Sequence, residues 1–167
     1  MAYFYKGNPV LEAQIDAYFA RLAAYNDTYC DGKLSVLLLG SLSRGEGTWQ
    51  PTDTGARLLS DIEYFTVYPD GFTEQAAFTD FAKEVQREVF VDQDSTLFHI
   101  DNTFVRRESL PRMERKLLTY DASRMGKTVV GEDLNFFKSG KRSRKSAEGV
   151  KIVLTVCYTR YKHVSYT

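Results

Sequence analysis

The apolar run from Leu34 to Leu39 is the clearest feature of the hydrophobic pattern, and polar segments border it on both sides. A short run of this length and composition is typical of a strand that is buried on both faces of a sheet. Asp31-Gly32 precedes it as a turn signal. We therefore expect a central strand over Leu34 to Leu39.

A helix is predicted before this strand. Asn8 is a typical capping residue, and Pro9 suits the first position of a helix. Apolar side chains then recur at helical spacing and predict one buried face: Leu11, Ile15, Tyr18, Phe19 and Leu22.

The pattern after the central strand predicts further elements in alternation. Leu58 to Val67 and Leu97 to Val105 have the composition of strands, with a short third strand at Thr128 to Gly131. Thr73 is placed to cap a helix, and Ser109-Leu110-Pro111 begins another. The helix after Thr73 repeats apolar residues at spacings of three and four: Phe78, Phe81, Val85 and Val89.

Two connections follow from glycine and proline. Leu42 to Gly47 predicts a short helix that Gly45 and Gly47 end, and Thr48 to Arg57 predicts a loop. Together the elements predict an α/β (α+β) protein. Its small, mixed, twisted sheet would have helices packed mainly on one face.

The amino-acid composition narrows the class of protein and agrees with the predicted α/β fold. The chain has 167 residues, of which 43% are hydrophobic and 26% charged, as in a soluble globular domain. Its start has no signal-peptide pattern and no apolar run is long enough to span a membrane, so we expect a cytoplasmic protein without membrane contact. Cys30 and Cys157 are expected to be free thiols, and two histidines make zinc an unsuitable metal.

Charge is unevenly distributed along the chain. From Lys138 to the end there are eight lysines and arginines against one glutamate, whereas the rest is acidic on balance. We therefore divide the chain into a folded domain, residues 1–137, and a basic C-terminal segment, residues 138–167. This segment has the charge to contact nucleic acid phosphates, but an exposed linker or tail is the favoured interpretation.

The candidate catalytic and binding residues lie close to the central strand in the sequence. Asp61 and Glu63 are two residues apart on a predicted strand, so both carboxylates would lie on one face. Two such carboxylates suit Mg²⁺, which prefers oxygen ligands. Gly40-Ser41, at the end of the central strand, would let a phosphate approach the backbone closely.

Gly40-Ser41 with Arg44-Gly45-Glu46, followed by Asp61-Ile62-Glu63, resembles the nucleotidyltransferases of the DNA polymerase beta-like superfamily. The resemblance covers roughly Leu34 to Leu134. It implies an enzyme that transfers a nucleoside monophosphate from a nucleoside triphosphate to an acceptor hydroxyl. It departs from the family in a nineteen-residue spacer, Leu42 to Ser60, and in Glu63, where many members have Asp.

The resemblance also assigns roles. Gly40, Ser41 and Arg44 would bind the triphosphate, while Asp61, Glu63 and a later strand acid would hold Mg²⁺, in a two-metal site. Asp101 fits that third acid and would act near the acceptor hydroxyl. Asp92 and Asp94 compete with it from a polar loop, and His99 is kept out of the site.

Several alternatives stay open. Arg44 suits either a phosphate contact or an ion pair with Glu46, and Trp49 suits either base stacking or, as favoured, anchoring of its own loop. The rival function is a non-catalytic nucleotide- or partner-binding module, antitoxin-like or regulatory, on the same fold. Neither the acceptor nor the preferred base can be read from the sequence.

Overall fold

The computed structural model describes residues 2–53, 55–93, 96–112, 122 and 125–134. Its main sheet has four strands in the order β5-β4-β1-β6, formed by Ser35–Leu38 (β1), Ile62–Tyr68 (β4), Ile100–Arg106 (β5) and Lys127–Val130 (β6). β1 runs antiparallel to both β4 and β6, whereas β4 and β5 are parallel. The sheet is therefore mixed, as the hydrophobic pattern predicts.

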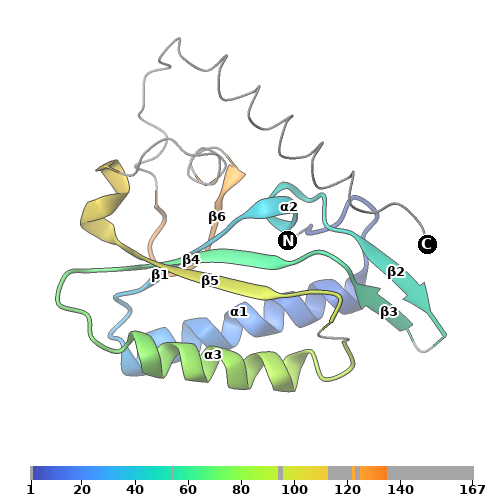
Figure 1. The fold of residues 1–167 in the computed structure, drawn as a ribbon, viewed down its shortest axis with the longest axis horizontal. Helices are drawn as coiled ribbons and strands as arrows, with labels where there is room; N and C mark the ends of the chain where they lie inside the picture. Colours follow the sequence, from blue (N-terminus) through green and yellow to red (C-terminus); the bar gives the residue numbers. More distant parts are fainter. Residues whose placement is uncertain (1, 54, 94–95, 113–121, 123–124, 135–167) are drawn as a thin grey trace, which may run out of the picture.

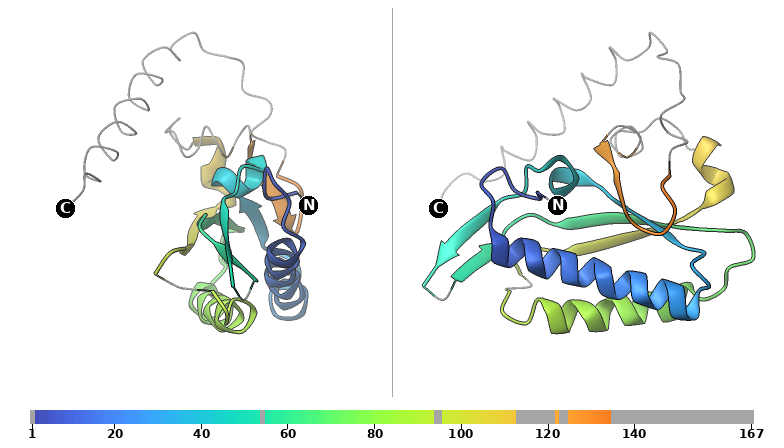
Figure 2. Two further views of the ribbon diagram at one scale, coloured as in Figure 1. Left: turned by 90° about the vertical axis from the view of Figure 1, so that its right-hand side faces the viewer. Right: turned by 180° about the vertical axis from the view of Figure 1, so that it is seen from behind.

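Two long helices, Pro9–Tyr29 (α1) and Gln75–Val89 (α3), lie side by side against one face of the sheet (Figures 1 and 2). Asn8 caps α1, and its side chain accepts a hydrogen bond from the backbone N–H of Leu11 at 3.2 Å. All five apolar residues predicted for the buried face of α1 are indeed buried. The expected packing of helices mainly on one face is confirmed for the described residues.

β1 is buried on both faces, as expected. Val36 and Leu38 pack into the core beneath the helices, and Leu37 and Leu39 pack into a second, smaller core on the other face. This second core is completed by side chains from β4, β5 and the segments that follow β5: Phe65, Val67, Val105, Leu110, Ala122 and Leu134.

A polar pair joins α1 to β4 inside the larger core. The hydroxyl groups of Tyr18 and Tyr64 lie 2.8 Å apart and share a hydrogen bond. Burial raises the pKa of both phenols, that of Tyr64 to about 12. Both side chains therefore stay protonated at physiological pH, and the hydrogen bond between the two hydroxyl groups is retained.

The predicted loop over Thr48 to Arg57 is wrong, because a β-hairpin of Trp49–Thr52 (β2) and Gly55–Leu58 (β3) occupies it (Figure 1). Gln93 stabilises the outer edge of β3. Its side chain accepts from the backbone N–H of Leu58 at 2.8 Å and donates to the carbonyl of Ala56 at 3.0 Å. Trp49 anchors the hairpin, since its indole N–H donates to the carbonyl of Lys6 at 2.9 Å.

Other boundaries also differ from the predictions. Glu74, not Thr73, is the N-cap of α3, and its side chain instead accepts hydrogen bonds from Thr73. A 3-10 helix, Arg107–Arg112 (η1), directly follows β5 where Ser109 was expected to begin a helix. The rest of the predicted helix, at 113–121, and the basic segment at 138–167, with Cys157, lie outside the described residues. None of the described helices combines the length and apolar character needed to cross a membrane.

Asn26 is a buried connector between α1 and β1, and its exposed fraction is only 1%. Its side chain accepts from the backbone N–H of Leu34 at 2.9 Å and donates to the carbonyl of the same residue at 3.0 Å. One amide thus satisfies both backbone groups of the residue that leads into the central strand.

We expect Asn26→Ala to lower the free energy of unfolding by about 2–4 kcal/mol, because two buried backbone groups would lose their partners. Urea denaturation of both proteins measures this difference. Thr28→Ala, a change at an exposed position on the same helix, is the matched control and should alter stability little. Equal midpoints for Asn26→Ala and the wild type would contradict this account of the connector.

Candidate active site

The site lies where β1 ends. The backbone N–H of Leu39 donates to the carbonyl of Glu63 at 2.8 Å, which extends the pairing of β1 with β4 by one residue. The chain then enters a short helix, Gly40–Arg44 (α2), that ends directly before Gly45 as predicted. This places Gly40-Ser41 beside the first residues of β4.

Gly40 and Glu63 are in direct contact. Gly40 has a φ of +66°, a backbone conformation that favours glycine. A Cβ atom at this position would overlap the tip of the Glu63 side chain, so a larger residue would force that flexible carboxylate to shift. The acid predicted to hold a metal therefore lies against the glycine predicted to admit a phosphate.

Asp101 is the register partner of Glu63 across the parallel pair β4 and β5. Neighbouring strands are about 4.8 Å apart, and residues in register present their side chains on the same face. Glu63 is half-buried and Asp101 is exposed. The strand acid that the sequence selects over Asp92 and Asp94 is thus brought beside Glu63.

Asp61 lies one residue before β4, outside the strand that was expected to carry it. Its carboxylate accepts a hydrogen bond from the backbone N–H of His99 at 2.7 Å. The backbone of Ile62 donates to the carbonyl of His99 at 2.9 Å. The hydrogen bond between Asp61 and His99 therefore links the start of β4 to the start of β5. His99 lies two residues before Asp101.

Ser41 and Arg44 both have partners within the protein. The hydroxyl of Ser41 donates to the Ser60 hydroxyl at 3.2 Å. Arg44 forms an ion pair with Glu46, in which Nε and Oε2 are 2.7 Å apart. Of the two interpretations of Arg44, the ion pair is the one present in the structure, and it leaves the side chain about one-quarter exposed.

The competing acids lie elsewhere or outside the described residues. Asp92 accepts from the side chain of Gln14 on α1 at 2.8 Å, which binds it to the helical layer. Asp94 is not among the described residues. Sequence reasoning missed two contributors, the buried hydroxyl of Ser60 and the backbone N–H of His99, because neither residue type is by itself a signal for a site.

Glu63 and Asp101 bring two carboxylates to neighbouring positions on one face of the sheet. Mg²⁺ is commonly bound by one or two carboxylates and completes its shell with waters and substrate phosphates. Within the described residues, no three His, Cys, Asp or Glu side chains are grouped so as to hold a metal ion.

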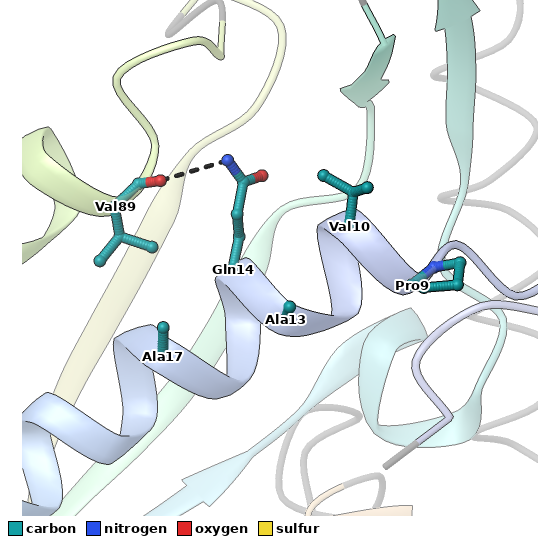
Figure 3. Close-up of a pocket in the computed structure, with 6 residues that line it drawn as sticks. All are labelled: Pro9, Val10, Ala13, Gln14, Ala17 and Val89. Atoms are coloured by element: carbon teal, nitrogen blue, oxygen red, sulfur yellow. Dashed lines mark hydrogen bonds between the residues drawn. The ribbon is translucent and has the colours of Figure 1, made fainter.

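An apolar groove lies on the other face of the molecule, between α1 and the end of α3 (Figure 3). Gln14 projects from α1 beside it and donates to the carbonyl of Val89 at 3.3 Å. The helices cover the face of the sheet that carries Ile62 and Tyr64, whereas Glu63 belongs to the opposite face. The groove is therefore separate from the candidate site.

No protein-family model and no curated protein matches this chain.

We expect Gly40→Ala to destabilise the protein more than Gly71→Ala. Both glycines have positive φ, at +66° and +77°, but a Cβ atom at Gly71 would meet nothing within 4 Å. Gly71→Ala thus measures the backbone cost, about 1–2 kcal/mol, and Gly40→Ala adds the overlap with Glu63. Urea denaturation gives both values.

The added cost should disappear in the Gly40→Ala/Glu63→Ala double variant, because the overlapping carboxylate is then absent. Equal destabilisation by Gly40→Ala and Gly71→Ala would show that the Glu63 carboxylate does not oppose a Cβ atom at Gly40, either because it lies elsewhere in solution or because it moves aside.

Proposed function

We propose that the protein is a Mg²⁺-dependent nucleotidyltransferase. It transfers a nucleoside monophosphate from a nucleoside triphosphate to an acceptor hydroxyl and releases pyrophosphate. The observation that carries the proposal is the contact of the Glu63 carboxylate with Gly40, beside Asp101 and at the end of the central strand. This contact joins the two halves of the sequence motif, which are separated by nineteen residues.

A metal ion at this place would make the charge of Glu63 compatible with a bound phosphate. A phosphate that approaches the backbone of Gly40 meets a carboxylate, and two negative groups at contact distance repel each other. A cation between them reverses the sign of the interaction. Glu63 and Asp101 would hold Mg²⁺. Asp61 lies at the same end of β4 and β5 but is not grouped with them, so it would have to turn toward the ion to serve as the third acid. The bound ion would supply positive charge to the triphosphate and to the acceptor oxygen.

The other residues bind and orient the substrates. Gly40 would admit the triphosphate to the backbone beside the Glu63 carboxylate, which would have to turn toward the metal ion, and Ser41 would contribute its amide at the start of α2. Arg44 lies at the end of α2 with its charge partly offset by Glu46, so phosphate contact would require it to exchange that partner. The triphosphate is thereby held with its α-phosphorus near the acids.

Asp101 is the residue placed to receive the proton of the acceptor. Its side chain is exposed, so an incoming hydroxyl can approach it from solvent. The acceptor oxygen forms a bond to the α-phosphorus, and the bond from that phosphorus to pyrophosphate breaks. The electron pair of the broken bond leaves with pyrophosphate, and the hydroxyl proton passes to Asp101 and then to water.

Two contacts favour a second candidate function, a non-catalytic module that binds a nucleotide or a protein partner. Asp61 accepts from the His99 backbone and Arg44 is paired with Glu46, so both groups already serve the fold. In that case the acids would stabilise the ends of the strands, and a nucleotide would bind without reacting.

We expect a non-hydrolysable nucleoside triphosphate to bind the full chain in a Mg²⁺-dependent manner, measured by calorimetric titration. Glu63→Ala/Asp101→Ala should weaken this binding by about tenfold or more, because the metal loses both carboxylates. Glu84→Ala removes an exposed carboxylate from α3, in the helical layer, and is the control that should bind as the wild type does.

Transfer is then tested with hydrolysable triphosphates by following pyrophosphate release across a set of hydroxyl acceptors. Magnesium-dependent binding without release would favour the non-catalytic module. A folded wild type that binds no triphosphate would exclude the transferase and would favour a module that binds a protein partner.

A further inference from the structure

Residues 3–6 form a strap beside the segment that joins α2 to the hairpin. The backbone N–H of Gly47 donates to the carbonyl of Tyr3 at 2.9 Å, and Phe4 forms a parallel bridge with Gly47. At the other end of the strap, the indole N–H of Trp49 donates to the carbonyl of Lys6. The strap is therefore bonded to this segment at both of its ends.

Gly47 is enclosed between the strap and α2. A Cβ atom at this position would overlap the carbonyl oxygen of Tyr3, the ring of Phe4 and the side chain of Leu42 on α2. Phe4 and Leu42 are both buried, and they belong to the larger core. Because the strap and α2 enclose Gly47 without spare room, the position of one limits the position of the other.

The side chain of Tyr3 fastens the strap to α1. It is buried, and its hydroxyl donates to the carboxylate of Asp16 at 2.6 Å. Burial, followed by the hydrogen bond to Asp16, raises the pKa of Tyr3, so the hydroxyl stays protonated at physiological pH and remains the donor. A hydrogen bond to a carboxylate is stronger than one between neutral groups. Tyr3 thus links α1, through its side chain, to Gly47, through its carbonyl.

The short helix α2 depends on such support. It has five residues, and a helix of this length is not stable without tertiary packing. Its last turn is closed by the backbone N–H groups of Gly45 and Glu46, which donate to the carbonyls of Leu42 and Ser41 at 3.2 and 2.8 Å. These bonds lie directly before Gly47 in the chain, so a movement of Gly47 would disturb them.

We propose that Tyr3 is a positioning residue for the candidate site, which holds α2, and with it Gly40 and Ser41, through the strap. When the hydrogen bond from Tyr3 to Asp16 is broken, the strap, the end of α2 and the base of the hairpin open together. The restraint on α2 needs no ligand. Only its effect on triphosphate binding rests on the proposed function.

A purely structural role of Tyr3 has a different signature. Tyr3 belongs to the larger core, so loss of its hydroxyl would then lower the stability of the whole domain and affect all its segments equally. Native-state hydrogen exchange separates the two roles, because it measures the opening of each segment individually.

The experiment compares hydrogen exchange of the full-length wild type with that of Tyr3→Phe, which removes only the hydroxyl. We expect the amides of Gly45, Glu46 and Gly47 to exchange about tenfold faster in Tyr3→Phe, the effect of losing one hydrogen bond to a charged group. Trp49 is the only tryptophan of the chain, so its indole N–H gives a single signal that reports on the hairpin end of the strap. This signal should also exchange faster.

Two controls make the comparison local. The amide of Phe90, at the end of α3, donates to the carbonyl of Gln86 and should exchange at the wild-type rate in Tyr3→Phe. Tyr5→Phe removes a hydroxyl from the same strap at a side chain that is 89% exposed, and it should leave all these rates unchanged. Equal acceleration at Phe90, or no acceleration at the end of α2, would overturn the proposal.

Asp16→Asn weakens the same hydrogen bond from the side of α1, because it replaces the carboxylate by a neutral acceptor. It should accelerate the exchange of Gly45, Glu46 and Gly47 and leave Phe90 unchanged. Wild-type exchange at the end of α2 in Asp16→Asn would contradict the role given to this bond.

A non-hydrolysable triphosphate with Mg²⁺ tests the link between the strap and the site. Coupling between two sites is reciprocal, so bound triphosphate should slow the exchange of the Gly47 amide by about threefold or more and leave Phe90 unchanged. A triphosphate that binds without slowing Gly47 would overturn the link. A folded wild type that binds no triphosphate would exclude the transferase, whereas the comparison without ligand still decides whether Tyr3 holds α2.

Discussion

The central strand β1 is buried on both faces, and its neighbours must supply a core on each side. Alternate side chains of β1 enter the helical core and the smaller core opposite, so its register with β4 is fixed. A slip by one residue would move Glu63 into the apolar layer beneath the sheet, where an ionised carboxylate costs several kcal/mol. The position of the candidate metal ligand is therefore set by hydrophobic packing.

Gly40 allows the chain to turn sharply beside Glu63, and this turn forms the candidate site. The chain leaves β1 and turns into α2 beside Glu63, the second residue of β4, and a side chain at Gly40 would overlap that carboxylate. Parallel pairing with β5 adds Asp101 on the same face, and the bond from Asp61 to the His99 backbone holds the two strand entrances together. Each acid is thus placed by backbone geometry before any ligand is bound.

The sequence predicts those parts of the fold that local chemistry determines. The cap at Asn8, the buried face of α1 and the double burial of β1 follow from residue type and period. The hairpin does not, because Pro51 and Gly55 also signal a loop and the side chain of Gln93 supplies its edge bonds from far along the chain. The same holds for the site: the register of Glu63 with Asp101 depends on a long-range pairing that no local pattern encodes.

The long spacer in the motif is explained by how the hairpin closes. The backbone of Leu59 donates to the carbonyl of Thr48 at 3.1 Å, and the Ser60 hydroxyl is hydrogen-bonded to Thr48 beside it. β2 and β3 therefore leave the site and return to it at one closed base. The hydrogen bonds at this base hold the two ends of the hairpin together. The hairpin can therefore be longer or shorter without changing the separation of Gly40 and Glu63. The distance between the two halves of the motif in sequence is, for this reason, a weak guide to their distance in space.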